Sequence, residues 1–133
     1  MRYLGIDYGS KRVGIAISDE EGKFAMPMIV LKNSKNTDAS ENLIKEIIEL
    51  AKKNEVTTIV IGESKDYKGK ANAILSESLN FKKDLEKKGF TVHLEPEFMT
   101  SVNAERFQGK NEMLDASAAA LILQSFLDRK KAV

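Results

Sequence analysis

The stretch Tyr3–Asp19, YLGIDYGSKRVGIAISD, decides the fold of this chain. Two apolar runs, Arg2–Asp7 and Arg12–Asp19, flank a turn signal at Tyr8–Ser10. The apolar residues of the second run alternate with small or polar ones, so they share one face of a strand. The stretch therefore predicts two adjacent strands, the first of which ends in an acid.

The rest of the chain alternates strands and helices. A tight turn at Glu20–Gly22 leads into a third strand over about residues 23–31, and strands joined this closely form an antiparallel hairpin. Apolar spacing then predicts helices over 37–54, 71–88, 101–107 and 114–128, with strands over 56–62 and 90–94. The second helix is expected to end at Gly89 and to turn inward Ile74, Leu75, Ser78, Leu79 and Leu85.

This order of elements predicts an α/β fold in one domain spanning residues 1–133. Its sheet is mixed and five-stranded, with three antiparallel strands followed by two parallel strands that are joined by helical crossovers. Helices are expected on both faces of this sheet, since the strand over 56–62 is β-branched and apolar on nearly every position.

Composition indicates a soluble globular protein. The 133 residues are 42% hydrophobic and 31% charged, and cysteine is absent, which excludes disulfides and thiolate metal sites. The start, MRYLGIDYGS, is unlike a secretory signal, and no apolar run approaches the ~20 residues that span a bilayer. We therefore expect a cytoplasmic protein without membrane contact. The net charge of +1 gives no strong indication of nucleic acid.

Asp7 is the first candidate for chemistry. It ends a strand at the centre of the predicted sheet, where desolvating an acid is costly unless a cation or hydrogen bonds compensate it. Gly5, Gly9 and Gly14 remove side-chain bulk around it and would let a phosphate approach closely. The alternative is a turn aspartate that accepts hydrogen bonds from nearby backbone N–H groups.

Two further acids could join Asp7. Glu97 follows the predicted strand over 90–94, and ligands of open α/β sheets bind beyond the carboxyl ends of strands. Asp115 lies in the first turn of the last helix, whose run of alanines would let it lie close to the sheet. The alternatives are a surface glutamate and a carboxylate that only complements the helix dipole.

Three carboxylates without histidine or cysteine favour Mg²⁺ or Mn²⁺ over Zn²⁺. Two such ions, ~3.5–4 Å apart, can promote in-line cleavage of a phosphodiester. His93, the single histidine of the chain, lies mid-strand and is expected to be structural.

The chain resembles the YqgF family, the Holliday-junction-resolvase-like members of the ribonuclease H superfamily, which is associated in bacteria with pre-16S rRNA processing. The resemblance extends over essentially the whole chain and is carried by four motifs: LGIDYGSKRVGIAISD at 4–19, VIGESKDYKGKAN at 60–72, PEFMTSVNA at 96–104 and LDASAAALILQSFL at 114–127. It implies the ribonuclease H fold and a metal-dependent nuclease.

Carried over to this sequence, the resemblance implies that Asp7, Glu97 and Asp115 are the catalytic acids and metal ligands. Other implied residues are Lys11 and Arg12 near the nucleic-acid phosphates, and Gly9, Ser10, Thr100 and Ser101 in support of the site. The chain departs from the family pattern at Pro96, where Asp is usual, and at Phe98, where Arg is usual. Glu63 could add a fourth carboxylate, although an exposed loop glutamate is the commoner case.

The expected partner is structured RNA or branched DNA. A basic loop after the strand over 56–62 could contact nucleic acid through Lys65, Tyr67, Lys68 and Lys70, or it could be a plain polar loop. Alternatives to a pre-16S rRNA nuclease are a Holliday junction resolvase, which would need two sites and hence a homodimer, and a catalytically drifted nucleic-acid-binding protein. An actin-like ATPase shares the strand-then-Asp-x-Gly pattern, but it needs two such domains.

Overall fold

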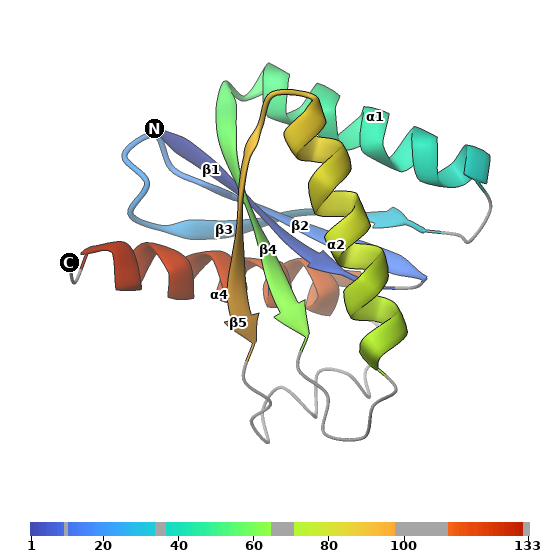
Figure 1. Ribbon diagram of the computed structural model, residues 1–133. Coiled ribbons are helices and arrows are strands. Elements are labelled where there is room, and N and C mark those ends of the chain that lie inside the picture. Colours follow the sequence, from blue (N-terminus) through green and yellow to red (C-terminus); the bar gives the residue numbers. More distant parts are fainter. Residues whose placement is uncertain (10, 34–36, 65–70, 98–111, 132–133) are drawn as a thin grey trace.

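The computed structural model describes residues 1–9, 11–33, 37–64, 71–97 and 112–131. Its elements run, in chain order, β1 (Arg2–Tyr8), β2 (Arg12–Ser18), β3 (Ala25–Lys32), α1 (Thr37–Lys53), β4 (Val56–Ser64), α2 (Ala71–Lys87), β5 (Thr91–Glu97) and α4 (Glu112–Lys131) (Figure 1). The predicted short helix over 101–107 lies outside the described residues.

The five strands form one mixed sheet in the order β3-β2-β1-β4-β5. β1 pairs antiparallel with β2, and β2 pairs antiparallel with β3, whereas β4 is parallel to both β1 and β5. The predicted topology is therefore confirmed. β1 and β4 lie inside the sheet, and β5 is an edge strand that pairs with β4 alone.

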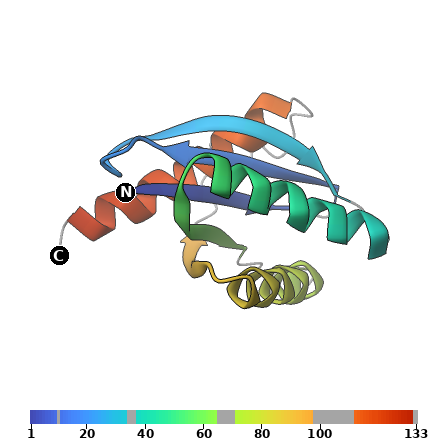
Figure 2. The same cartoon turned by 90° about the horizontal axis from the view of Figure 1, so that it is seen from above.

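Helices cover both faces of the sheet, as predicted: α1 and α2 lie on one face and α4 lies on the other (Figure 2). The larger core lies under α1 and α2, where Leu4, Ile6 and Ile15 of the first two strands meet Ile47 of α1 and Leu85 of α2. The smaller core lies under α4 and buries Tyr3, Ala16 and Val60 against that helix. No described helix is long and apolar enough to cross a membrane.

The β2–β3 turn is ordered by Asp19. Its carboxylate accepts hydrogen bonds from the backbone N–H groups of Lys23, at 2.7 Å, and Phe24, at 3.2 Å. These donors hold the pKa of Asp19 below its ordinary value, with the Lys23 N–H as the larger cause. Gly22 supplies the left-handed conformation in this turn, with a φ of 69°.

Two predicted details are corrected. β5 does not stop at Leu94 but continues to Glu97, because an edge strand tolerates Pro96 without losing a central ladder. In α2, Leu79 is 37% exposed while Phe81 is buried against Tyr8, with ring centroids 5.2 Å apart. The inward row of this helix thus contains an aromatic residue that the apolar spacing did not select. Ser78 and Leu85 are buried as predicted, and the side chains of Ile74 and Leu75 lie outside the described part.

Candidate active site

The carboxyl ends of three parallel strands meet at one edge of the sheet. β1 pairs with β4 as far as Ile6, and the ends of β4 and β5 pair through Ser64 and Glu97. Asp7 is the last residue but one of β1, Glu63 is the last but one of β4, and Glu97 is the last residue of β5. All three therefore lie near the carboxyl ends of the strands, where open α/β sheets bind ligands. The fold brings the backbone of these three predicted acids to the same end of the sheet.

Asp7 lies within β1, one residue before its end, and pairs with Gly14 of β2. Its side chain is half-buried on a strand that has neighbours on both sides. Asp7 therefore belongs to the strand ladder and directly precedes the last residue of β1.

Helix α4 lies very close to strands β1 and β4. A Cβ atom added at Gly5 of β1 would lie 2.7 Å from the Cβ of Leu123 and 3.0 Å from the carbonyl oxygen of Ala119. At Gly62 of β4 it would lie 2.5 Å from the Cδ1 of Ile122. The prediction that the alanine-rich part of this helix lies close to the sheet is thus confirmed.

This close contact determines where the first turn of α4 lies relative to β1. Asp115 belongs to the first turn of α4, one turn before Ala119, which touches β1. Figures 1 and 2 place the N-terminal end of the helix on the side of the sheet where β1 ends. The backbone of Asp115 is therefore carried toward the strand end that holds Asp7.

The turn after β1 is held by a residue that the sequence did not reveal. Asn33 donates its side-chain N–H to the carbonyl of Gly9 at 2.7 Å, and its backbone N–H donates to the carbonyl of Lys11 at 2.8 Å. A Cβ at Gly9 would lie 2.6 Å from the carbonyl oxygen of Arg12, so this position requires glycine. Beside this turn, Lys11 is exposed and Arg12 is half-buried.

Several predicted site residues cannot be placed in the same detail. For Glu63, Glu97 and Asp115 the backbone is described, while their side chains lie outside the described part. Outside the described residues altogether are Ser10, Lys65, Tyr67, Lys68, Lys70, Thr100 and Ser101. Among the side chains that are described, no group of three His, Asp or Glu could hold a metal ion, and Asp7 is the one predicted ligand in that set.

The contacts of Glu95 are a second feature that the sequence did not reveal. Its side chain is buried in β5 and forms an ion pair with Arg129 of α4, and it also accepts a hydrogen bond from Ser125 at 2.9 Å. The partners lie 30 and 34 positions away in the sequence, so no local pattern indicates them. On the same strand, His93 stacks on Phe126 at 5.2 Å, in line with the structural role expected for it.

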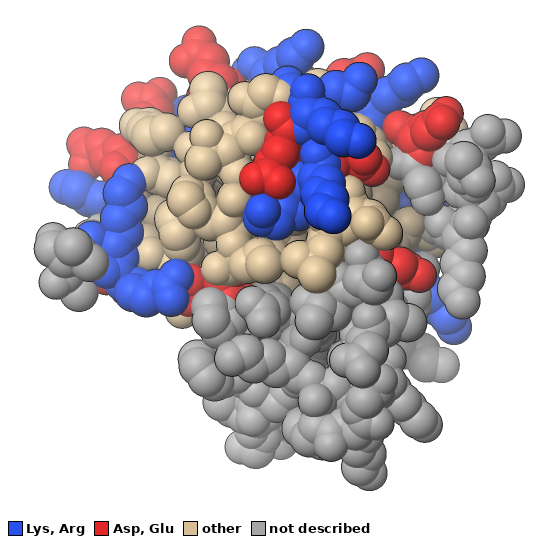
Figure 3. Space-filling model, viewed as in Figure 1, with Lys and Arg blue, Asp and Glu red and all other residues tan. Residues whose placement is uncertain are grey.

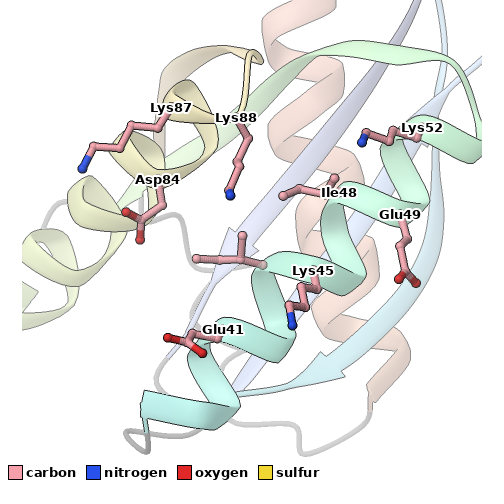
Figure 4. Close-up of a pocket in the computed structure, with 9 residues that line it drawn as sticks. Glu41, Lys45, Ile48, Glu49, Lys52, Asp84, Lys87 and Lys88 are labelled. Carbon is pink, nitrogen blue, oxygen red and sulfur yellow. The ribbon is translucent and has the colours of Figure 1, made fainter.

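A groove of about 670 Å³ lies elsewhere, between α1 and α2 (Figure 4). Ile44 and Ile48 line it together with lysines and acids of both helices, including Asp84 near the end of α2. Figure 1 shows that end of α2 far from the carboxyl ends of β4 and β5. On the face seen in Figure 3, Lys and Arg side chains are intermixed with Asp and Glu, which gives no single-sign surface there.

Comparison with known proteins identifies the family. A family model described as "RuvX: Holliday junction resolvase" matches residues 1–129. A protein of Lactobacillus helveticus named as a pre-16S rRNA nuclease is 33% identical, over 96% of each chain. The RuvC structure of Thermus thermophilus superposes with a TM-score of 0.67 and 15% identity, covering 98% of this chain and 97% of that one. The same RuvC in complex with a Holliday junction gives 0.66 at 13% identity, covering 98% and 96%. The chain therefore belongs to the RuvX (YqgF) family of resolvase-like nucleases and has the ribonuclease H-like fold that RuvC shares.

Proposed function

We propose that this protein is a nuclease, dependent on Mg²⁺ or Mn²⁺, that hydrolyses phosphodiester bonds of structured RNA in the 5′-end processing of pre-16S rRNA. The proposal is supported by the place of Asp7 near the end of the central strand β1, onto which helix α4 packs at Gly5. Glu97 ends β5, and Asp115 lies in the first turn of α4. The name of the Lactobacillus helveticus relative supports the choice of substrate.

The donor set fits hard divalent cations. Asp7, Glu97 and Asp115 offer carboxylate oxygens alone, the chain contains no cysteine, and the ring of His93 is stacked on Phe126. These three acids, with Glu63 as an additional candidate, would hold the metal ions. When bound, the ions supply an activated water and stabilise the leaving oxygen.

The remaining residues of the site bind and orient the substrate. Lys11 lies in the turn after β1 and Arg12 begins β2, and both would neutralise substrate phosphates. Asn33 fixes this turn through its two hydrogen bonds, so the cationic side chains start from an ordered backbone. We expect the basic loop with Lys65, Tyr67, Lys68 and Lys70 and the segment with Thr100 and Ser101 to add contacts. A homodimer is expected where the substrate has two-fold symmetry.

The test is cleavage of a labelled pre-16S rRNA fragment and, separately, of a four-way DNA junction, each with Mg²⁺, Mn²⁺ or EDTA. We expect metal-dependent cutting of the RNA that falls about 100-fold or more in Asp7→Asn, since metal ions contribute several kcal/mol to such a transition state. Asp84→Asn is the matched control, because Asp84 is an exposed acid on α2. It should cut like the wild type.

Each other outcome points to a named alternative. Cutting of the junction but not of the RNA would indicate a resolvase. Salt-sensitive RNA binding without cutting would indicate a drifted binding protein, with Pro96 and Phe98 as the first suspects. Cutting that survives both EDTA and Asp7→Asn would contradict the carboxylate–metal site.

A further inference from the structure

Glu95 is a charged residue placed where charges are rarely found. It is 3% exposed, and its two carboxylate oxygens are bound by different partners on α4: the guanidinium of Arg129 and the hydroxyl of Ser125. Burying a carboxylate costs several kcal/mol unless an ion pair and hydrogen bonds compensate it. An apolar residue would fill this position at lower cost, so stability alone does not explain the choice of glutamate.

The location of this ion pair suggests what it does. β5 is the edge strand and is paired with β4 alone, so the end of β5 is held from one side of the sheet only. Glu95 lies two residues before Glu97, and Ser125 lies ten residues after Asp115 on a single helix. The contact therefore joins the strand that carries one candidate metal ligand to the helix that carries another.

We propose that Glu95 is a positioning residue of the active site: its bonds to Arg129 and Ser125 fix the end of β5, and with it Glu97, against α4. This inference rests on the proposed function, because it assigns Glu97 and Asp115 to one metal site. Glu95 is not itself assigned as a ligand, since both of its oxygens are already engaged. Instead it acts through Glu97, two residues further along the strand.

Helix α4 is attached to β5 in a different way from its attachment to β1 and β4. At β1 and β4, helix α4 is placed by direct contact with Gly5 and Gly62, which leave no room for adjustment. At β5 the attachment is made by side chains, and the Arg129 side chain is 56% exposed. The position of Glu97 relative to Asp115 should therefore be more sensitive to a polar substitution at Glu95 than to changes elsewhere on β5.

The test measures Mn²⁺ binding by the whole chain 1–133, without substrate, together with the melting temperature and the cleavage rate. Glu95→Gln keeps the shape and the Ser125 hydrogen bond but loses the ion pair. We expect it to bind Mn²⁺ about 10-fold more weakly, the usual cost of removing a residue that orients a metal ligand. The rate at saturating RNA should fall, while KM for the RNA stays unchanged.

Two partner variants and one control make the result specific. Arg129→Lys keeps the positive charge and should bind Mn²⁺ nearly as the wild type does, whereas Ser125→Ala removes one hydrogen bond and should weaken binding less than Glu95→Gln. Glu86→Gln breaks an ion pair of similar chemistry on α2, with Lys82 at 3.2 Å, and should leave Mn²⁺ binding unchanged. Should Glu95→Gln fold poorly, Ser125→Ala carries the same test.

The outcomes separate this inference from the proposed function. Wild-type Mn²⁺ affinity in both Glu95→Gln and Ser125→Ala, with a lowered melting temperature, would show a structural role only and overturn the positioning role. Asp7→Asn, measured in parallel, must lose Mn²⁺ binding if the site exists. Loss in Asp7→Asn without loss at Glu95 would leave the proposed function standing and remove this inference alone.

Discussion

The two faces of the sheet are packed in different ways. Under α1 and α2, large aliphatic side chains such as Ile6, Ile47 and Ile59 fill the space between helix and strand. Under α4, the helix lies close to the strands at Gly5 and Gly62, which contribute no side chain of their own to the contact. The first face therefore supplies most of the hydrophobic stabilisation, whereas the second sets the distance between the helix and the strands.

The α4 face also relies on polar bonds. Gln124 accepts a hydrogen bond from the N–H of Ala25 at 2.8 Å and donates one to the carbonyl of Lys23 at 3.0 Å, which ties the helix to the β2–β3 turn. Glu95 and Arg129 tie it to β5 at the other edge. These bonds are directional, so they fix the helix in place and not merely close to the sheet. The face under α1 and α2 therefore supplies most of the hydrophobic stabilisation, whereas the face under α4 fixes where that helix lies on the sheet.

The largest effect on stability is expected on the α1 face. Ile47→Ala removes a fully buried side chain of α1 and should lower the free energy of unfolding by about 2–5 kcal/mol. Because Ile47 lies on the face opposite α4, the cleavage rate per folded molecule should be unchanged. Urea unfolding and single-turnover cleavage measure the two quantities. A large loss of rate in folded Ile47→Ala would contradict this division between the faces.

Gly5→Ala should lower the cleavage rate strongly and the stability only moderately, the reverse of Ile47→Ala. The added Cβ would overlap the Cβ of Leu123 and the backbone carbonyl of Ala119, and neither of these can rotate away. We expect about 1–3 kcal/mol of destabilisation from overpacking. The cleavage rate should fall by about 100-fold, because an ångström of displacement at Asp115 is enough for that. A folded Gly5→Ala with full activity would show that the helix position does not matter to the site.

Much of this division could be read from the sequence. The alternation in Arg12–Ser18 gave the face of β2, and the alanines around Ala119 gave the close approach of the last helix. Both predictions succeed because they depend on the spacing of apolar and small residues within a single strand or helix.

What could not be predicted depends on contacts between distant residues. The extension of β5 to Glu97 follows from its edge position, which a single strand's sequence does not reveal. The pairing of Glu95 with Arg129 links elements 34 positions apart, and Asn33 reaches Gly9 across 24. Phe81 is buried because the ring of Tyr8 lies beside it, a fact of the tertiary structure. The family resemblance identified candidate acids, but not the residues that hold their strands.

A smaller effect is expected at Gly62, where the contact is with the end of a side chain. The Cδ1 of Ile122 is 2.5 Å from the position of an added Cβ, while its Cγ1 and Cγ2 are 3.2 and 3.5 Å away. Gly62→Ala should cost about 1 kcal/mol, and Ile122→Val, which lacks Cδ1, should relieve part of it. In a double-mutant cycle we expect a favourable coupling of about 0.5–1 kcal/mol between the two changes. Strict additivity would mean that α4 has already moved away at this point.

The smallest expected effect is a change in how stability depends on pH, and it concerns Asp19 in the β2–β3 turn. The hydrogen bonds from Lys23 and Phe24 lower the pKa of Asp19 in the folded protein, so the ionised form contributes stability above the unfolded pKa. That contribution is lost as the pH falls below about 4, through the lower folded value. Asp19→Asn should therefore show a shallower loss of stability in this window, measured by urea unfolding from pH 5 to 2.5. Ile47→Ala should keep the wild-type slope, because no titrating group is removed. Gln124 of α4 is hydrogen-bonded to the same turn as Asp19. If stability fell equally steeply with pH in the wild type, Asp19→Asn and Ile47→Ala, the turn would be held by α4 and not by the Asp19 carboxylate.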